Sequence, residues 1–389
     1  MPEPALELAG IFRQYGPAYR KAHKLTPHQH KLMRAVETCR TPALGATVEH
    51  CDRCQFAPIR YRSCRNRHCP KCQGAARLKW LQQRRQELLP VVYFHVVFTL
   101  PHQLAAIAFY NPKAVYDLLF RITSETLLTI ARDPQRLGVE LGFFAVLHTW
   151  GQNLHFHPHL HCVVPGGGLS PGALEARRWI HGRRRYLLPV QVLSRLFRRR
   201  FLEELEKLHA SGQLQFFGEL ESLRDAAAFH RYLAPLRQTE WVVYAKPPFG
   251  GPLQVLHYLG RYTHRVAISN QRLRKLENGQ VSFDGKDYRA PLQQQHKLMT
   301  VSAEEFIRRF LQHTLPPGFQ RIRYYGFLTN RYRAALLPVC RQLLATPSSA
   351  LLPAPPIAPI PSCPGPRCPR CGSVLSRILI LSGQGLDSS

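Results

Sequence analysis

The sequence 148-HTWGQNLHFHPHLHCVVP-165 follows an apolar run, 143-FFAVL-147, and is followed by three glycines at positions 166 to 168. This pattern is typical of a strand, a tight polar turn, a second strand and a loop. We therefore predict a β-hairpin here and take it as the centre of the expected fold.

The second strand of this hairpin carries His157, His159 and His161 at alternate positions, so all three imidazoles point to one face. Neighbours on that face lie roughly 7 Å apart, close enough for two of them to share a cation. The outer two, His157 and His161, would be roughly 13 Å apart, which is too far for one ion. A metal ion would take two of the three, and another element would supply the rest.

Gln152 lies across the turn and offers a carbonyl oxygen to the same ion. Imidazole and oxygen ligands with open positions suit Mg²⁺ or Mn²⁺ better than a structural zinc ion. The alternative is a strand whose histidines only face solvent. So many histidines beside an apolar strand favour the metal site.

Two CxxC motifs, Cys51-x-x-Cys54 and Cys69-x-x-Cys72, are separated by fourteen residues. Each presents two thiolates to one ion, and two such motifs complete a tetrahedral Zn²⁺ shell. The spacing predicts one structural zinc ion in an N-terminal module. Cys64, His68 and His50 are surplus: one of them could replace a ligand, or a second ion could bind.

The charge of the chain indicates a polyanionic partner. Its 389 residues include 53 Lys and Arg against 24 Asp and Glu, a formal net charge of +29. Nucleic acid is the first candidate, because the basic residues are spread over all segments. An anionic membrane is the competing partner, but no basic amphipathic anchor, signal peptide or transmembrane run stands out. We expect a cytoplasmic protein whose 11 cysteines are reduced.

Basic residues surround the CxxC motifs, and Arg65, Arg67 and Lys71 are the candidates for contacts with DNA phosphates. The alternative is a purely structural zinc module that makes no DNA contact.

The stretch 253–265 is expected to be a helix with Tyr258 and Tyr262 on one face, about 6 Å apart. Such a pair is usually part of a core. Here the helix is short and basic, and Arg261 and Arg265 beside the tyrosines are further candidates for contacts with DNA. A phenol can attack phosphorus when a cation withdraws charge from the phosphate.

The remaining periodicity predicts further elements and a tail. Thr346 to Pro369 is rich in proline and reads as a linker, and Cys368-x-x-Cys371 is one further knuckle that binds zinc with Cys363 and another ligand, or binds nothing. Helices are expected within 6–40 and at 75–89, 103–111, 113–133, 190–210, 302–313 and 331–344, and strands at 91–101, at 241–246 and on both sides of Asn278-Gly279.

With these motifs in this order, the chain resembles the rolling-circle transposases of the insertion-sequence-ninety-one type, which are two-tyrosine members of the HUH (His-hydrophobic-His) nucleases. The resemblance covers roughly residues 10–335. It is carried by five stretches: 63-SCRNRHCPKC-72, 95-HVVFTLP-101, 150-WGQN-153, 157-HPHLH-161 and 258-YLGRYTHR-265.

The resemblance implies an α+β fold. A zinc-binding, DNA-contacting module would occupy 1–90 and an HUH catalytic domain, an antiparallel sheet with flanking helices, would occupy 91–335. A basic helix, a proline-rich linker and a disordered tail would follow over 336–389.

The resemblance also implies roles for single residues. His159 and His161 would be metal ligands and Tyr258 and Tyr262 nucleophiles. Gln152 would be the third ligand, although some relatives supply it from the tyrosine helix. The general base stays open between three side chains: His157, His264 and Lys246.

The implied function is nicking and rejoining of single-stranded DNA at transposon ends, through a 5′-phosphotyrosine, by a nucleoid-associated bacterial enzyme. Two alternatives remain: a plasmid or phage replication initiator or relaxase, and a non-catalytic zinc protein that only binds nucleic acid.

Overall fold

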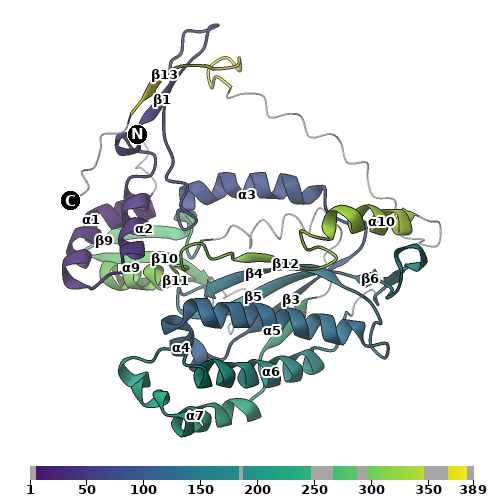
Figure 1. Ribbon diagram of the computed structural model, residues 1–389. Coiled ribbons are helices and arrows are strands. Elements are labelled where there is room, and N and C mark those ends of the chain that lie inside the picture. The colour runs from purple at the N-terminus through teal and green to yellow at the C-terminus, as the bar shows by residue number, and fades with distance from the viewer. Residues whose placement is uncertain (1–5, 184–186, 247–265, 287–295, 346–366, 383–389) are drawn as a thin grey trace. The chain divides into compact units, whose positions relative to one another are not determined.

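The computed structural model describes residues 6–183, 187–246, 266–286, 296–345 and 367–382 (Figure 1). The chain forms two compact units. The first unit combines residues 1–76, 264–314 and 352–389, and the second combines 77–263 and 315–351. These units interleave along the chain, because each combines stretches that are separate in sequence. The division into 1–90, 91–335 and 336–389 stays a prediction.

The second unit is built on an antiparallel sheet in the order β12-β4-β5-β3-β8. Its centre is the hairpin that the sequence predicts. All nine residues of β4 are buried, which explains its uninterrupted apolar run. The strands are β3 (Tyr93–Thr99), β4 (Gly142–Trp150), β5 (Phe156–Pro165), β8 (Val243–Lys246) and β12 (Ile322–Gly326).

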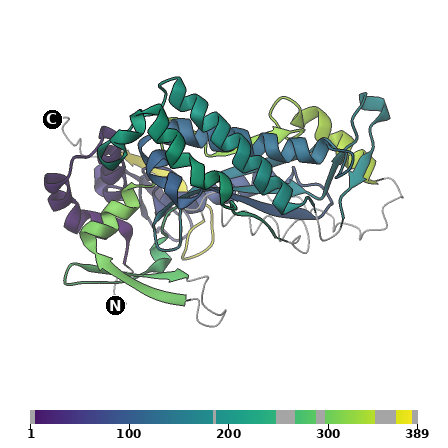
Figure 2. The same ribbon diagram turned by 90° about the horizontal axis from the view of Figure 1, so that it is seen from below.

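Helices cover one face of this sheet. Alternate residues of β3 (Phe94, Val96 and Phe98) and β5 (Leu160 and Cys162) enter one apolar core with these helices. Figure 2 shows α6 and α7 (teal) on this side of the sheet, beyond α5. The helices are α4 (Ala105–Tyr110), α5 (Pro112–Arg132), α6 (Val190–Ala210) and α7 (Ala226–Gln238).

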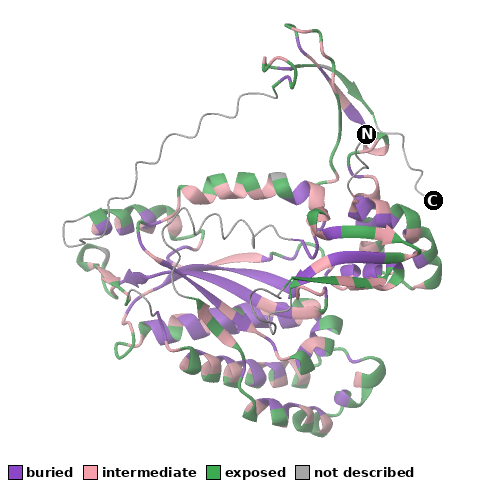
Figure 3. Ribbon diagram, turned by 180° about the vertical axis from the view of Figure 1, so that it is seen from behind, coloured by how far each residue is buried: buried purple, intermediate pink, exposed green. Residues whose placement is uncertain are grey.

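A smaller core covers part of the opposite face. It joins Val146 and Val163 to residues of α3 (Pro70–Arg85) and α10 (Arg333–Ala345). The Trp80 ring packs edge-on against Phe144, with ring centroids 5.8 Å apart. The sheet is therefore buried between layers, as its purple strands show (Figure 3).

Short elements complete the description of this unit and of the connections. The glycines after β5 lead into β6 (Gly167–Leu169), which pairs with β7 (Trp179–His181). Within the described residues, no helix is both long and apolar enough to cross a membrane. The 3₁₀ helices are η1 (Pro42–Leu44), η2 (His102–Leu104), η3 (Leu174–Ala176), η4 (Gly218–Arg224) and η5 (Asn270–Arg272).

The first unit contains α1 (Leu8–Ala22), α2 (Pro27–Glu37), α9 (Ala303–Leu311) and a sheet in the order β11-β10-β9. Asn278 and Gly279 have φ values of 48° and 74°, so they form the hairpin turn that their sequence predicts. The Ser302 hydroxyl accepts from the Glu305 amide and caps α9. The strands are β9 (Leu273–Glu277), β10 (Gln280–Lys286) and β11 (His296–Ser302).

A second sheet of this unit, in the order β13-β1-β2, pairs a strand from the C-terminal segment with two strands from the N-terminal segment. Within the segment expected to be a tail, residues 367–382 are described and contain β13 (Ser376–Leu381). This strand pairs antiparallel with β1 (Ala46–His50), which also pairs with β2 (Ile59–Tyr61), as Figure 1 shows.

Candidate active site and metal centres

Three histidines of the central hairpin converge on one point. The ligand atoms of His148, His159 and His161 all lie within 4.8 Å of one another. His148 faces His159 across the β4–β5 ladder, and Val146 faces His161, so all three imidazoles share one face of the sheet. This is the face opposite the large helical core.

His148 is a member of this cluster that the sequence does not predict. Periodicity along β5 shows that His159 and His161 share a face, but it does not say which residue of β4 lies opposite them. The sequence feature that could have indicated His148 as a ligand is its position near the end of β4, two residues before Trp150, the last residue of the strand.

Hydrogen bonds engage the Nδ1 atoms of two of the rings, so Nε2 is the nitrogen that each ring can offer to a metal ion. The Nδ1 atom of His159 lies 2.7 Å from the carbonyl oxygen of His157 and must donate to it. The Nδ1 atom of His161 lies 2.7 Å from Nε2 of His95 on β3. Metal-binding histidines typically donate their other ring nitrogen in this way.

His95 completes the arrangement from the neighbouring strand. Burial, together with the nearby Lys246 and His159, lowers the pKa of His95 to about 3. A neutral His95 can accept the Nδ1–H of His161, which leaves the lone pair of His161 on Nε2. Burial also lowers the pKa of His157.

The donor set fits a divalent ion. Metal–nitrogen bonds of about 2.1 Å place ligand atoms at neighbouring coordination positions roughly 3 to 3.4 Å apart. Nitrogens within 4.8 Å of one another reach this spacing with small side-chain movements. Gln152 lies in the turn between β4 and β5, and its role as an oxygen ligand stays a prediction.

Several other predicted site residues lie outside the described residues: Tyr258, Tyr262, His264, Arg261 and Arg265. Lys246 is the last described residue before them. It ends β8, is exposed, and faces His95 in the β3–β8 ladder.

Four cysteines of the first unit form one cluster: Cys39, Cys64, Cys69 and Cys72. The Cys72 sulfur lies 3.5 Å from that of Cys39 and 3.6 Å from that of Cys64. Zinc–sulfur bonds of about 2.3 Å require sulfur atoms roughly 3.8 Å apart in a tetrahedral site. Burial raises the pKa of Cys39 to about 11, so a cation is needed to hold its thiolate.

The prediction that Cys51, Cys54, Cys69 and Cys72 share one ion is wrong. Cys51 and Cys54 lie instead with Cys368 and Cys371 in a separate cluster. Cys51 and Cys54 lie in the turn between β1 and β2, whereas Cys69 and Cys72 lie after β2, where α3 begins. Each motif therefore completes its set with cysteines that its own spacing does not reveal.

The three additional candidate zinc ligands, Cys64, His50 and His68, have different surroundings. Cys64 joins a cluster, whereas His50 bonds to Asp52 and Gln55 at 3.0 and 2.9 Å. His68 is buried, and it stands between Cys64 and Cys69 in the sequence. The cluster that contains these two cysteines has four thiols and does not include His68.

Three of the basic residues predicted to contact DNA are described, and their surroundings differ. Arg65 is exposed, with a φ of 53°. Burial lowers the pKa of Arg67. Lys71 forms an ion pair with Glu7 at 2.6 Å. Contact of these residues with DNA stays a prediction.

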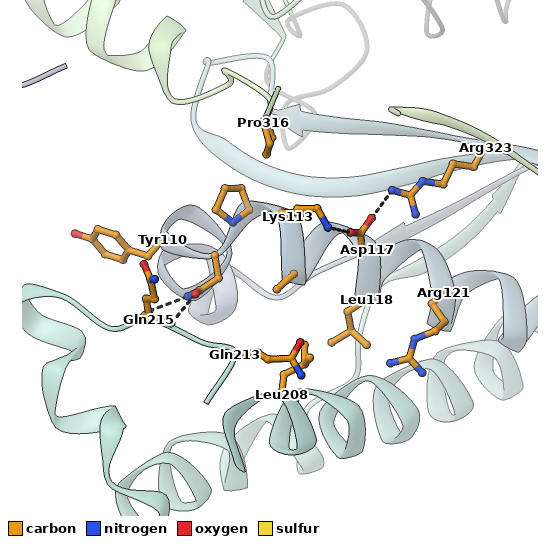
Figure 4. A pocket seen from close by; sticks show the side chains of 13 residues that line it. Tyr110, Lys113, Asp117, Leu118, Arg121, Leu208, Gln213, Gln215, Pro316 and Arg323 are labelled. Carbon is orange, nitrogen blue, oxygen red and sulfur yellow. Dashed lines mark hydrogen bonds and ion pairs between the residues drawn. The ribbon is translucent and has the colours of Figure 1, made fainter. Parts of the chain in front are cut away.

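Figure 4 shows a cavity of the second unit, and none of the clustered histidines or cysteines lines it. It has a volume of about 670 Å³ and is bordered by α5 and the start of β12. Asp117 pairs there with Lys113 and Arg323. No histidine of the cluster lines this cavity, so it does not contribute to the candidate active site.

Replacing Cys69 with serine is expected to remove one zinc equivalent per chain and to unfold the region around it, because zinc binding supplies much of the folding free energy of such modules. Native mass spectrometry measures the zinc content, and amide exchange of residues 27–50 measures the unfolding. Cys162→Ala is the control, since Cys162 lies buried in the sheet outside both clusters. A Cys69→Ser protein with wild-type zinc content would contradict this assignment.

Comparisons with known proteins agree with the two kinds of site. A family model described as "Putative transposase" matches residues 142–335, which include the histidine cluster. Another, described as "Transposase zinc-binding domain", matches residues 11–100, which include all of the Cys39 cluster. No solved structure matches the chain.

Two curated relatives match most of the chain. It is 62% identical over 339 residues to "Putative transposase y4qJ" of Sinorhizobium fredii, covering 87% of this chain and 84% of that protein. It is 31% identical over 369 residues to "Transposase for insertion sequence element IS801" of Pseudomonas savastanoi pv. phaseolicola, covering 90% and 84%. The chain thus belongs to the insertion-sequence-ninety-one type of transposases, with an N-terminal domain that binds structural zinc, and its partner is DNA.

Proposed function

We propose that this transposase nicks and rejoins single-stranded DNA at transposon ends in a rolling-circle process, using a divalent ion and a tyrosine nucleophile. The observation that carries the proposal is the convergence of His148, His159 and His161 on one face of the sheet. This face belongs to the segment that matches the transposase family.

The chain's own residues hold and orient the metal ligands. His159 and His161 present Nε2 because His157 and His95 engage their Nδ1 atoms. A divalent ion bound there would withdraw charge from the scissile phosphate. Imidazoles suit first-row transition ions better than they suit Mg²⁺, so Mn²⁺ is the first ion to test. Gln152 is the proposed oxygen ligand.

Tyr258 or Tyr262 is the proposed nucleophile. The phenolate oxygen attacks phosphorus, the bond from phosphorus to the 3′ oxygen breaks, and that oxygen takes up a proton. The products are a 5′-phosphotyrosine and a free 3′-OH. Attack by a 3′-OH on this ester restores the DNA and the tyrosine, so rejoining needs no ATP. Two tyrosines allow one strand end to be held while another is cut.

The proposed nucleophiles are close in sequence to a strand of the sheet that carries the histidine cluster. Tyr258 follows Lys246 by 12 residues, and Lys246 faces His95 across the sheet. Twelve residues reach at most about 40 Å, more than the width of the five-stranded sheet. Three side chains are the proposed bases for the phenol: His157, whose pKa burial lowers, Lys246 and His264.

Incubation with labelled single-stranded oligonucleotides from the element's ends and Mn²⁺ tests the proposal. We expect a covalent protein–DNA species in a denaturing gel with 5′-phosphate DNA attached, and none when EDTA is present. The same sequence as a duplex should give less product. A protein that binds these oligonucleotides tightly but never forms the species would be a non-catalytic binder, and the proposal would fail.

His95 is expected to act as a positioning residue for His161. His95→Leu removes the acceptor for the Nδ1–H of His161, whereas His95→Gln retains an acceptor at a similar distance. Loss of such an outer partner typically weakens metal affinity about 10- to 100-fold. We expect this loss in Mn²⁺ titrations of the leucine variant and partial recovery in the glutamine variant. Equal Mn²⁺ affinity in both variants and the wild type would show that His95 has only a packing role.

A further inference from the structure

We propose that the chain holds a second structural zinc ion, bound by Cys51, Cys54, Cys368 and Cys371, which fastens the C-terminal segment to the N-terminal domain. The zinc-binding family model covers residues 11–100 and therefore includes only the first two of these cysteines. The transposase model ends at residue 335. Neither match assigns a role to the C-terminal pair.

The four sulfur atoms have the spacing of a tetrahedral thiolate site. They all lie within 4.8 Å of one another. Cys51 and Cys371 are 3.4 Å apart, and Cys54 and Cys368 are 3.5 Å apart. These separations are close to the roughly 3.8 Å of a zinc tetrathiolate and far above the roughly 2.05 Å of a disulfide.

The two knuckles that supply these cysteines have the same backbone conformation. In the first, the Cys51 amide donates to the carbonyl of Phe56 and the Gln55 amide donates to the carbonyl of Cys51, at 3.0 and 2.8 Å. In the second, the Cys368 amide donates to the carbonyl of Ser373, at 2.7 Å, and the Gly372 amide donates to that of Cys368, at 2.9 Å. The two sets of bonds match residue for residue.

The residue after each second cysteine is also equivalent. Gln55 and Gly372 have φ values of 57° and 74°, in the left-handed region. For glutamine this conformation is unfavourable, so something in the first knuckle must stabilise it. Hydrogen bonds of the Gln55 side chain with His50 and with the Asp52 carbonyl contribute to that stabilisation, and a metal ion that draws both thiolates to one point would add to it. Two segments more than 300 residues apart therefore form matched halves of one site.

Apolar packing around the cluster is too small to hold the segment by itself. Besides the cysteines, the local core contains buried Leu375 and partly buried Phe56. The Arg370 guanidinium lies over the Phe56 ring, 4.3 Å from its centroid. Ordering residues 367–382 costs conformational entropy, and the apolar contacts described around the cluster are too few to offset that cost. A further source of free energy is required. Zinc bound by four thiolates is such a source.

The strand pairing shows what this ion would achieve. β13 adds to the edge of β1 from Ala46↔Leu381 to His50↔Ser376, with a register shift between Val48 and Glu49. Zinc would fasten this strand at the end where the knuckles meet. The segment 367–382 is then a part of the zinc-binding domain rather than a free extension.

Zinc content of the full chain tests the proposal. Native mass spectrometry of tag-free protein, purified with a reductant, should find two zinc ions per chain. Cys368→Ser combined with Cys371→Ser should reduce this to one. Cys363→Ser is the matched control, because this cysteine precedes Cys368 by five positions in the sequence and is not one of the four proposed ligands, so the variant should retain two zinc ions. A wild-type chain with one zinc ion, or a double variant with two, would overturn the proposal.

Amide exchange provides a readout that does not depend on catalysis. In the double variant, residues 46–50 should exchange faster at the positions that pair with β13, while α2 keeps its protection. The reciprocal variant Cys39→Ser should lose the other ion and keep the β1–β13 protection. Loss of both ions in either variant would show that the cysteines form one interdependent site, and the proposal of a separate second site would fail. Zinc content and amide exchange do not depend on DNA cleavage, so they test the second zinc site independently of the proposed function.

Discussion

Replacing His161 with alanine is expected to lower the rate of DNA cleavage by at least about a thousandfold, while affinity for single-stranded DNA changes little. The His161 imidazole is one of three nitrogens in the cluster, and losing it leaves the ion with too few ligands to stay bound. Metal polarisation of a phosphate contributes several kcal/mol, and each 1.36 kcal/mol changes a rate tenfold. The rate is measured with a labelled oligonucleotide in Mn²⁺, and affinity by fluorescence anisotropy.

Two further alanine variants distinguish the observed cluster from the one expected from strand periodicity. His148→Ala should be as inactive as His161→Ala, since His148 belongs to the cluster. His157→Ala should be milder, because His157 orients His159 through its backbone carbonyl, which alanine retains. If His157→Ala abolished Mn²⁺ binding while His148→Ala cleaved normally, the metal site would have been assigned to the wrong histidines.

Replacing Tyr258 and Tyr262 together with phenylalanine is expected to abolish the covalent protein–DNA species completely. Phenylalanine keeps each ring and removes only the hydroxyl, so the change separates chemistry from packing. Each single variant should still form the species on a simple oligonucleotide through the remaining tyrosine. Each should fail in complete transposition, where two strand ends must be handled.

Peptide mapping locates the attachment. DNA should be found on Tyr258 or Tyr262 and on no other residue. Thermal unfolding of the double variant serves as the control and should match the wild type. A double variant that still nicks DNA, or an adduct on another tyrosine such as Tyr244 of β8, would show that the predicted helix is not the source of the nucleophile.

Elements with a local cause could be predicted from the sequence. The apolar run before the turn and the alternation after it predict the β4–β5 hairpin, which the structure contains. Asn278-Gly279 predicts a turn between two strands, and the periodicity of 302–313 predicts a helix; the turn and α9 confirm these two predictions. Each of these features depends on residues within a few positions of one another, so spacing and side-chain type are enough to identify it.

The membership of each metal centre was decided by tertiary structure. Cys51 and Cys69 have similar motifs, yet they join different clusters because one motif meets the C-terminal knuckle and the other meets Cys39 and Cys64. Thiolates bind together whenever folding brings their sulfur atoms close, whatever their separation along the chain. Spacing could identify both motifs as candidate metal ligands, but it could not show which cysteines each motif joins.

The same reason applies to the candidate active site. The sequence by itself determined that His159 and His161 share a face, because strand geometry is periodic. Only the pairing of β4 with β5 brought His148 opposite His159, and only the pairing of β3 with β5 brought His95 to His161. Strand order and register depend on how the whole sheet buries its two faces, and no single strand carries that information.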